Sequence, residues 1–247
     1  MREILRWELR SPLNLAMVSG GAVLIGLVMK RFYLTWNATI RPGPFGPDVL
    51  GSIFRTAFTG DVYLLLALLV PFIMTLAVRL ERDEGVALSI YSLPVSRAGV
   101  LASKFLAVFL TLFVFLLSTH ILIFVLHFAA TPGAVVGVLR IHTIPMAFFY
   151  ASVLLFMISV AAVVSILSPN AYLSIFGGFV VLYLPKFLGA EWFWFLKWGK
   201  VLTDYHPATI SLTMDPIFGM EFLRTSLLPA IVLAGLYLAI GHWRDVR

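Results

Sequence analysis

Six long runs of apolar residues divide this chain, and they constrain its fold more than any other feature. A helix needs roughly 20 apolar residues to cross a membrane, and only helices or closed barrels satisfy their backbone hydrogen bonds there. The runs predict six membrane-spanning helices, at about residues 13–33, 62–80, 100–128, 143–167, 172–189 and 225–243. The expected fold class is therefore all-α: a polytopic membrane protein with a single transmembrane domain over residues 1–247.

Composition supports this expectation. The chain is 61% hydrophobic and 12% charged, whereas soluble domains contain about 25% charged residues. The net charge of +6 suits contact with anionic lipid headgroups. No nucleic-acid partner is expected, because the arginines are scattered among loops and form no basic stripe. The absence of cysteine excludes disulfides and thiolate metal sites.

The first ten residues, MREILRWELR, predict an amphipathic helix that lies in the membrane interface. At helical spacing Arg2, Arg6 and Arg10 share one face, while Trp7 lies on another. Charges interrupt the stretch too often for a signal peptide. The alternative is a disordered basic start.

The even number of predicted spans places both termini on one side of the membrane. Lys and Arg are enriched in cytoplasmic loops. Each side holds nine of them, but those on the terminal side occupy much shorter segments. Their density predicts cytoplasmic termini for a multi-pass protein of the cell inner or plasma membrane.

A charged stretch, ERDEGVALSIYSLPVSR, fills residues 81–97 between two apolar runs. Gly85 can end the helix that leaves the second span. Residues 86–93 then form about two turns, and Pro94 ends them, because the residue before a proline disfavours the helical region. Ser96 is placed to cap the third span. The pattern predicts a short amphipathic helix on the cytoplasmic face.

Two interpretations of this helix remain open. A chain does not need such elaboration to reverse direction, since Ser168, Pro169, Asn170 and Ala171 suffice between the fourth and fifth runs. A structured, charged and amphipathic loop is typical of a docking surface for another protein. The alternative is a solvated loop whose acids face water.

The same stretch resembles the signature of type-2 ABC exporter permeases. Its parts are an acidic segment with a glycine (Glu81 to Gly85), a turn reading Pro94-Val95-Ser96-Arg97, and Lys104 at the start of the third span. The order of elements over the whole chain also agrees with this family. One departure is Gly85-Val86-Ala87-Leu88, where the family usually has Gly-Thr-Leu-Glu, so Leu88 replaces an acid.

The resemblance implies two partner proteins besides the lipid bilayer. A second permease subunit, identical or related, would complete the pathway, and a separate ABC ATPase subunit would bind Mg-ATP and receive a coupling helix at about residues 84–93. An interfacial helix made by Arg2, Arg6, Trp7 and Arg10 would brace that contact. The residues expected to dock are Glu81, Arg82, Asp83, Glu84, Gly85, Val86, Ile90, Tyr91, Leu93, Pro94 and Arg97.

No ATP-binding motif is expected to act in this chain, so the chain is not predicted to be an enzyme or to hold a cofactor. A phosphate-binding loop needs Gly-x-x-x-x-Gly-Lys-[Ser/Thr]. The chain contains one Gly-Lys pair, Gly199-Lys200, and Val201 follows it.

Three histidines are the main ionisable candidates near or inside the spans. His120 lies in the middle of the third run, His127 is seven residues on, and His142 begins the fourth. Three imidazoles can bind a metal or relay protons. The simpler interpretation, which we favour, is that there is no metal site and that His120 bonds a neighbouring helix.

The sequence favours an ATP-driven exporter permease over three other classes. A secondary transporter is the main alternative, but it predicts inverted repeats and acids at the membrane midplane, and neither is found. An intramembrane enzyme would need a motif such as His-Glu-x-x-His. A plain membrane anchor leaves the docking-like stretch unexplained.

Overall fold

The structure is a computed structural model that describes residues 61–80, 96–127, 132–187 and 227–244, together with positions 5, 19–21, 23, 26, 27 and 30. Within these ranges the elements are all helical. They are α4 (Asp61–Met74), η1 (Thr75–Leu80), α7 (Arg97–His127), α8 (Pro132–Leu167), α9 (Ala171–Phe187) and α14 (Leu228–Arg244). The all-α prediction is confirmed for this part of the chain.

Among the described residues, three helical segments are long and apolar enough to cross a membrane: Val62–Arg79, Arg97–Leu122 and Tyr150–Leu167. Two shorter apolar helical segments, Ala171–Leu184 and Leu228–Gly241, coincide with the fifth and sixth predicted spans. Most of the first predicted span lies outside the described residues. The described ends of the second, third, fifth and sixth spans fall within about three residues of the predicted ones.

The largest difference is the start of α8, which begins at Pro132 rather than near residue 143. Proline suits the first position of a helix, because its missing N–H would have no intrahelical partner there. The helix then continues through Arg140 and His142, polar residues that interrupt the apolar run. At about 1.5 Å per residue this helix is longer than a membrane core requires.

The second span is not a uniform α-helix. Pro71 lies inside α4, and the wider π-helix η1 begins at Thr75. Proline has no N–H to donate and therefore interrupts the α-helical bonding pattern. A π-helical turn within a span often marks a functional position.

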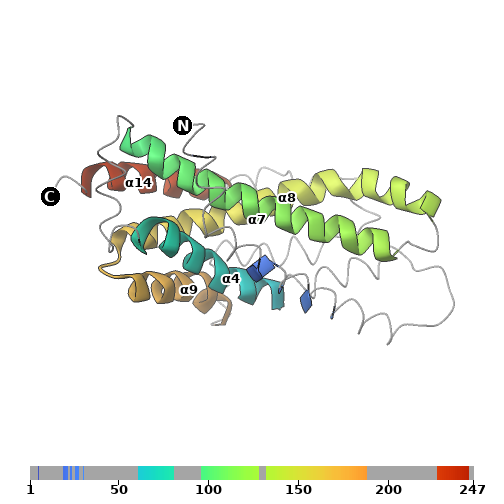
Figure 1. The fold of residues 1–247 in the computed structure, drawn as a ribbon, viewed down its shortest axis with the longest axis horizontal. Coiled ribbons are helices and arrows are strands. Elements are labelled where there is room, and N and C mark those ends of the chain that lie inside the picture. The colour runs from blue at the N-terminus through green and yellow to red at the C-terminus, as the bar shows by residue number, and fades with distance from the viewer. Residues whose placement is uncertain are drawn as a thin grey trace.

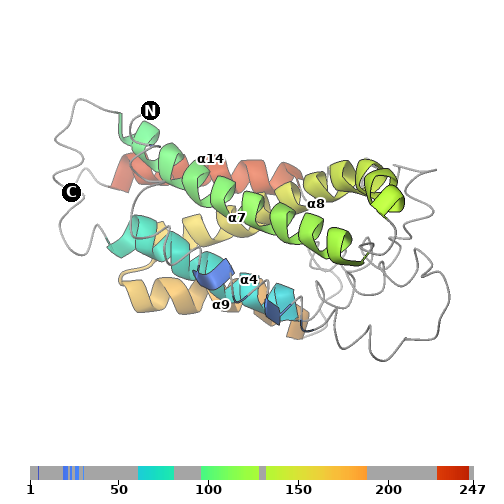
Figure 2. The same ribbon diagram turned by 45° about the vertical axis from the view of Figure 1, so that its right-hand side comes forward.

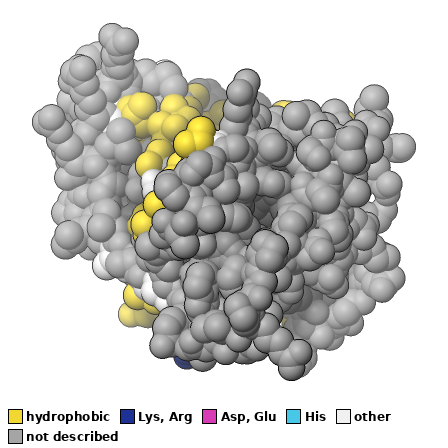
Figure 3. Space-filling model, turned by 90° about the vertical axis from the view of Figure 1, so that its right-hand side faces the viewer, with side chains coloured by type: hydrophobic (Ala, Val, Ile, Leu, Met, Phe, Trp, Pro, Cys, Tyr) yellow, Lys and Arg dark blue, Asp and Glu magenta, His cyan; other side chains and the backbone are white. Residues whose placement is uncertain are grey.

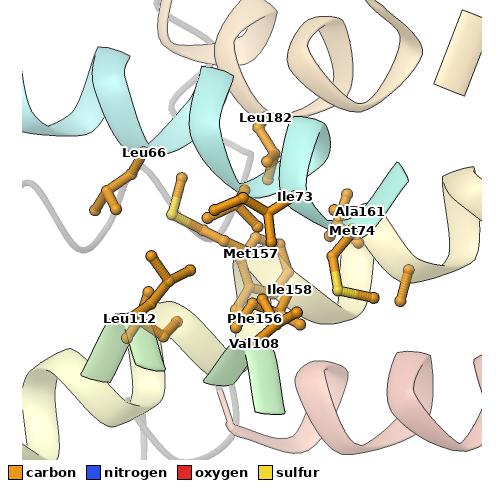
Figure 4. Close-up of a cluster of buried hydrophobic side chains, with 14 of the residues drawn as sticks. Leu66, Ile73, Met74, Val108, Leu112, Phe156, Met157, Ile158, Ala161 and Leu182 are labelled. Atoms are coloured by element: carbon orange, nitrogen blue, oxygen red, sulfur yellow. The ribbon is translucent and has the colours of Figure 1, made fainter. Parts of the chain in front are cut away.

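Helix α8 is the centre of the bundle and contacts α4, α7, α9 and α14 (Figures 1 and 2). Helices α7 and α8 extend past the others at one end. Figure 3 views the molecule from that side, where most of the coloured side chains are hydrophobic. Figure 4 shows the core, in which Met157 of α8 lies among side chains of α4 and α7 such as Ile73 and Leu112.

Two glycines of the first predicted span, Gly20 and Gly21, lie in close contact with neighbouring helices, which small residues permit. A Cβ added at Gly20 would lie 2.7 Å from Leu69 Cδ1, and one at Gly21 would overlap the ring of Phe115. At Gly26 an added Cβ would meet no described atom within 4 Å, so close contact there stays a prediction.

Helix α7 begins with the predicted cap. The N–H of Gly99 donates to Ser96 Oγ at 3.2 Å, and the N–H of Val100 donates to Ser96 O at 3.1 Å. Val100 is buried, 1% exposed, so the capped turn is fixed against the bundle.

Replacing Ser96 with alanine should lower the free energy of unfolding by about 1 kcal/mol, because a helix N–H loses its acceptor. Ser96→Asp should retain most of the stability, since a carboxylate also caps a helix and favours its N-terminus. Thermal unfolding of the purified protein in one detergent would compare the two variants. Equal destabilisation by alanine and aspartate would contradict the assigned cap.

Candidate functional site

The predicted docking stretch lies largely outside the described residues. Of its members Glu81, Arg82, Asp83, Glu84, Gly85, Val86, Ile90, Tyr91, Leu93, Pro94 and Arg97, the structure describes Arg97, which starts α7 and is half-buried. The predicted interfacial residues Arg2, Arg6, Trp7 and Arg10 also lie outside the described part. Their roles stay predictions.

The C-terminal end of the α4–η1 helix and the start of α7, which flank residues 81–95, lie at one end of the bundle. The turn between α8 and α9 and the last turns of α14 lie at the same end (Figures 1 and 2). Hydrogen bonding supports this placement, because Tyr237 Oη of α14 donates to Leu101 O of α7 at 3.3 Å. Packing agrees, since a Cβ added at Gly241 would overlap the side chain of Leu101.

Arg79 joins η1 to the turn between α8 and α9. Its Nη2 donates a hydrogen bond to the carbonyl of Pro169. Arg79 is 9% exposed, so its charge is largely withdrawn from solvent. A buried charge must be compensated, and Pro169 follows the C-terminus of α8, where the helix dipole favours a cation. This location therefore suits the guanidinium.

Two further contacts hold η1 and the residue before it. Thr75 Oγ1 and Ser174 Oγ are 2.6 Å apart, and both residues are 1% exposed. Ser165 Oγ donates to Met74 O at 3.5 Å. We call these contacts the polar clamp (Met74, Thr75, Arg79, Ser165, Pro169 and Ser174). Interhelical hydrogen bonds inside membranes contribute about 0.6 kcal/mol on average.

Other buried hydroxyls in the spans are used differently. Ser103, Thr119 and Ser159 each donate to the carbonyl four residues earlier in their own helix. Such bonds satisfy a polar group locally and connect nothing. The clamp hydroxyls of Thr75, Ser165 and Ser174 instead connect η1 and its neighbour to two other helices.

The turn between α8 and α9 is itself well fixed. Val164 O accepts two hydrogen bonds from Ser168, one from its N–H at 2.9 Å and one from its Oγ at 2.7 Å. These bonds cap the C-terminus of α8. Asn170 then caps α9, because its Oδ1 accepts from the N–H of Leu173 at 2.8 Å. Pro169 lies between these two capping residues, so its carbonyl is held in place for Arg79.

Lys104, predicted from the family signature, lies in the second turn of α7 and is 3% exposed. Its side chain is therefore almost completely withdrawn from solvent. Lysines near the end of a membrane span usually extend their ammonium group to water or headgroups, and Lys104 does not have that exposure.

His120 bonds a neighbouring helix, as the simpler interpretation holds. Its Nδ1 and Tyr150 Oη are 3.3 Å apart, both residues are 1% exposed, and the rings meet edge to face. The side chains of His127 and His142 are not among those described. Within the described part of the chain, no group of three His, Cys, Asp or Glu side chains is placed to hold a metal ion.

Sequence reasoning missed the polar clamp. Arg79 offered a signal, since it is an ionisable residue inside a predicted span. Thr75, Ser165 and Ser174 gave none, because serine and threonine in a span usually bond within their own helix.

These features define the class of the protein as a multi-pass helical membrane protein. Its two connections that are predicted to be cytoplasmic, residues 81–95 and 168–170, begin at the same end of the bundle. A family model described as ABC-2 family transporter protein matches residues 9–185, and the chain belongs to that family. No curated protein matches the chain. The family match confirms the resemblance that was seen in residues 81–104.

Family membership makes the chain a permease component of an ABC transporter in a membrane. Members are membrane subunits rather than ATP-binding domains, which agrees with the predicted absence of an ATP site from this chain. The family also implies pairing with an ATPase subunit.

Proposed function

We propose that this chain forms the substrate pathway of an ATP-driven exporter, works as a dimer and is coupled to a separate ATPase subunit. The observation that carries the proposal is the family match over residues 9–185, which includes the whole charged stretch 81–97. The position of the C-terminal end of the α4–η1 helix and the start of α7 at the end that holds the α8–α9 turn supports it.

In this proposal, residues at about 84–93 form a coupling helix that occupies a groove of the ATPase. Glu81 and Asp83 precede the helix, Glu84 begins it, and Arg97 follows it at the start of α7. The N-terminal helix at 2–11 lies beside it in the membrane interface, and both termini are cytoplasmic. Mg-ATP binds in the partner, closes the ATPase dimer and moves the coupling helices, and the attached spans tilt.

The proposed cargo is amphipathic or lipid-like. The described spans offer few charged groups at depth, and their buried residues are mainly Leu, Val, Ile, Ala and Met. Hydrated ions need polar ligands inside a pathway. An apolar pathway, or a seam between two subunits, suits a molecule with its own apolar surface.

Co-expression with the ATPase encoded nearest to this chain tests the proposal. We expect the two proteins to co-purify in nanodiscs and to hydrolyse ATP, and we expect that replacing 81–97 with a glycine-serine linker abolishes the complex. A folded permease and a folded ATPase that never associate would contradict the proposed function.

A further inference from the structure

The η1 side of the polar clamp lies directly before the proposed docking stretch in the sequence. Arg79 is two residues from Glu81, and its guanidinium bonds the carbonyl of Pro169 in the α8–α9 turn. Thr75, at the first position of η1, bonds Ser174 in the first turn of α9. The clamp therefore holds η1 at both ends, and both attachments are to the same helical hairpin.

A π-helix needs such attachments to carry a displacement. π-Helical segments are rare and are mostly single turns inside α-helices, so η1 is a local departure from the α-helical winding on either side of it. If η1 were not attached to other helices, it could change its winding when residues 81–95 are displaced. The displacement would then be absorbed in η1 and would not reach other helices. Attachments at Thr75 and Arg79 prevent this, because η1 cannot rewind without moving α9 or breaking both contacts.

The hairpin itself is suited to transmit movement. Capping by Ser168 and Asn170 fixes the turn, and Pro71 of α4 packs closely on Gly178 of α9. A displacement that reaches Pro169 and Ser174 is therefore passed to the whole of α9 rather than absorbed in the loop.

We propose that Arg79 is a positioning residue that, with the Thr75–Ser174 pair, makes η1 and the α8–α9 hairpin move as one unit when the ATPase displaces residues 81–95. This proposal rests on the proposed function. It predicts that the clamp stays closed throughout the transport cycle, and that α9 follows η1.

A disulfide tests the closed clamp. The chain contains no cysteine, so Thr75→Cys with Ser174→Cys creates a single possible intramolecular pair. The hydroxyl oxygens of Thr75 and Ser174 are 2.6 Å apart, so the two side chains meet directly and a cysteine pair at these positions can be tested for oxidation. In the complex with the ATPase, oxidation should leave ATP hydrolysis unchanged, and the two single-cysteine variants serve as controls.

Arrest of hydrolysis by about tenfold on oxidation, with recovery on reduction, would overturn the proposal, since it would mean that η1 and α9 must separate in each cycle. A wild-type permease that neither binds nor stimulates the ATPase is a different result. It would contradict the proposed function, and the two failures are thus distinguishable.

A second experiment tests Arg79 itself through movement of α9. Tyr172, in the first turn of α9, is 86% exposed, so Tyr172→Cys can be labelled by a membrane-impermeant thiol reagent. We expect its labelling rate to change about fivefold or more between the nucleotide-free complex and the complex trapped with ATP and vanadate. Arg79→Met should abolish that change, and Arg79→Lys should restore it.

Complex assembly is measured in parallel, because a merely structural role would reduce assembly in proportion to labelling. Normal assembly with a nucleotide-dependent labelling change that survives Arg79→Met would overturn the proposal. So would a constant labelling rate in the chain with an intact clamp. If the methionine variant fails to fold, the disulfide experiment decides alone.

Discussion

Reversal of three charges, Glu81→Lys, Asp83→Lys and Glu84→Lys, is expected to uncouple the ATPase while the permease still inserts into the membrane. These acids lie at the start of the proposed coupling helix, within five residues after the clamp residue Arg79. Electrostatic complementarity across an interface fixes register and suppresses wrong contacts. Three reversed charges should therefore reduce permease-dependent ATP hydrolysis by at least about tenfold.

A matched control carries the same change of charge elsewhere. Asp204, Asp215 and Glu221 belong to the segment between the fifth and sixth predicted spans, on the opposite side of the membrane in our topology. Reversing them should leave ATP hydrolysis at the wild-type level. Normal coupled activity of the Glu81, Asp83 and Glu84 variant would contradict the docking role, and so would equal loss in both variants.

Gly178→Leu is expected to separate α9 from α4 and to destabilise the whole bundle. An added Cβ at Gly178 would lie 2.7 Å from Pro71 Cβ and 3.0 Å from its Cγ. The proline ring cannot rotate away, whereas a leucine tip such as that of Leu101 beside Gly241 can. Overpacking of this kind typically costs about 1–3 kcal/mol, and a rigid neighbour places the change at the upper end.

Gly235→Leu is the matched control, because an added Cβ at this position of α14 meets no described atom within 4 Å. Thermal unfolding in the same detergent should show a clearly lower midpoint for Gly178→Leu and a nearly unchanged one for Gly235→Leu. Equal midpoints would mean that α4 and α9 do not pack as the structure has them.

Much of the scaffold could be predicted because a membrane imposes strong requirements on a chain. Apolar length alone located the helices at the second, third, fifth and sixth predicted spans, and the cap at Ser96 followed from residue type and position. The start of α8 was missed for a specific reason. Arg140 and His142 lower the hydropathy where the helix in fact continues from Pro132.

The candidate site divides in the same way. Residues 81–97 are conspicuous in the sequence because of their charge and because of Gly85 and Pro94. The docking role of this stretch could therefore be predicted from the sequence alone. The polar clamp could not be predicted from the sequence. It joins Thr75 to Ser174, 99 residues apart, and Arg79 to a backbone carbonyl. A carbonyl has no sequence signal, and side-chain hydroxyls in spans are too common to indicate a pair.

Photo-crosslinking from the docking stretch tests the central claim most directly. A photoreactive benzoylphenylalanine replaces Tyr91 in one variant and Val136 in another. Val136 is 71% exposed and lies near the start of α8, at the end of the bundle opposite the clamp. We expect illumination of the purified complex to link position 91, but not position 136, to the ATPase subunit. An ATP-hydrolysing complex in which position 91 never links to the ATPase, or links no better than position 136, would contradict the coupling role of residues 81–97.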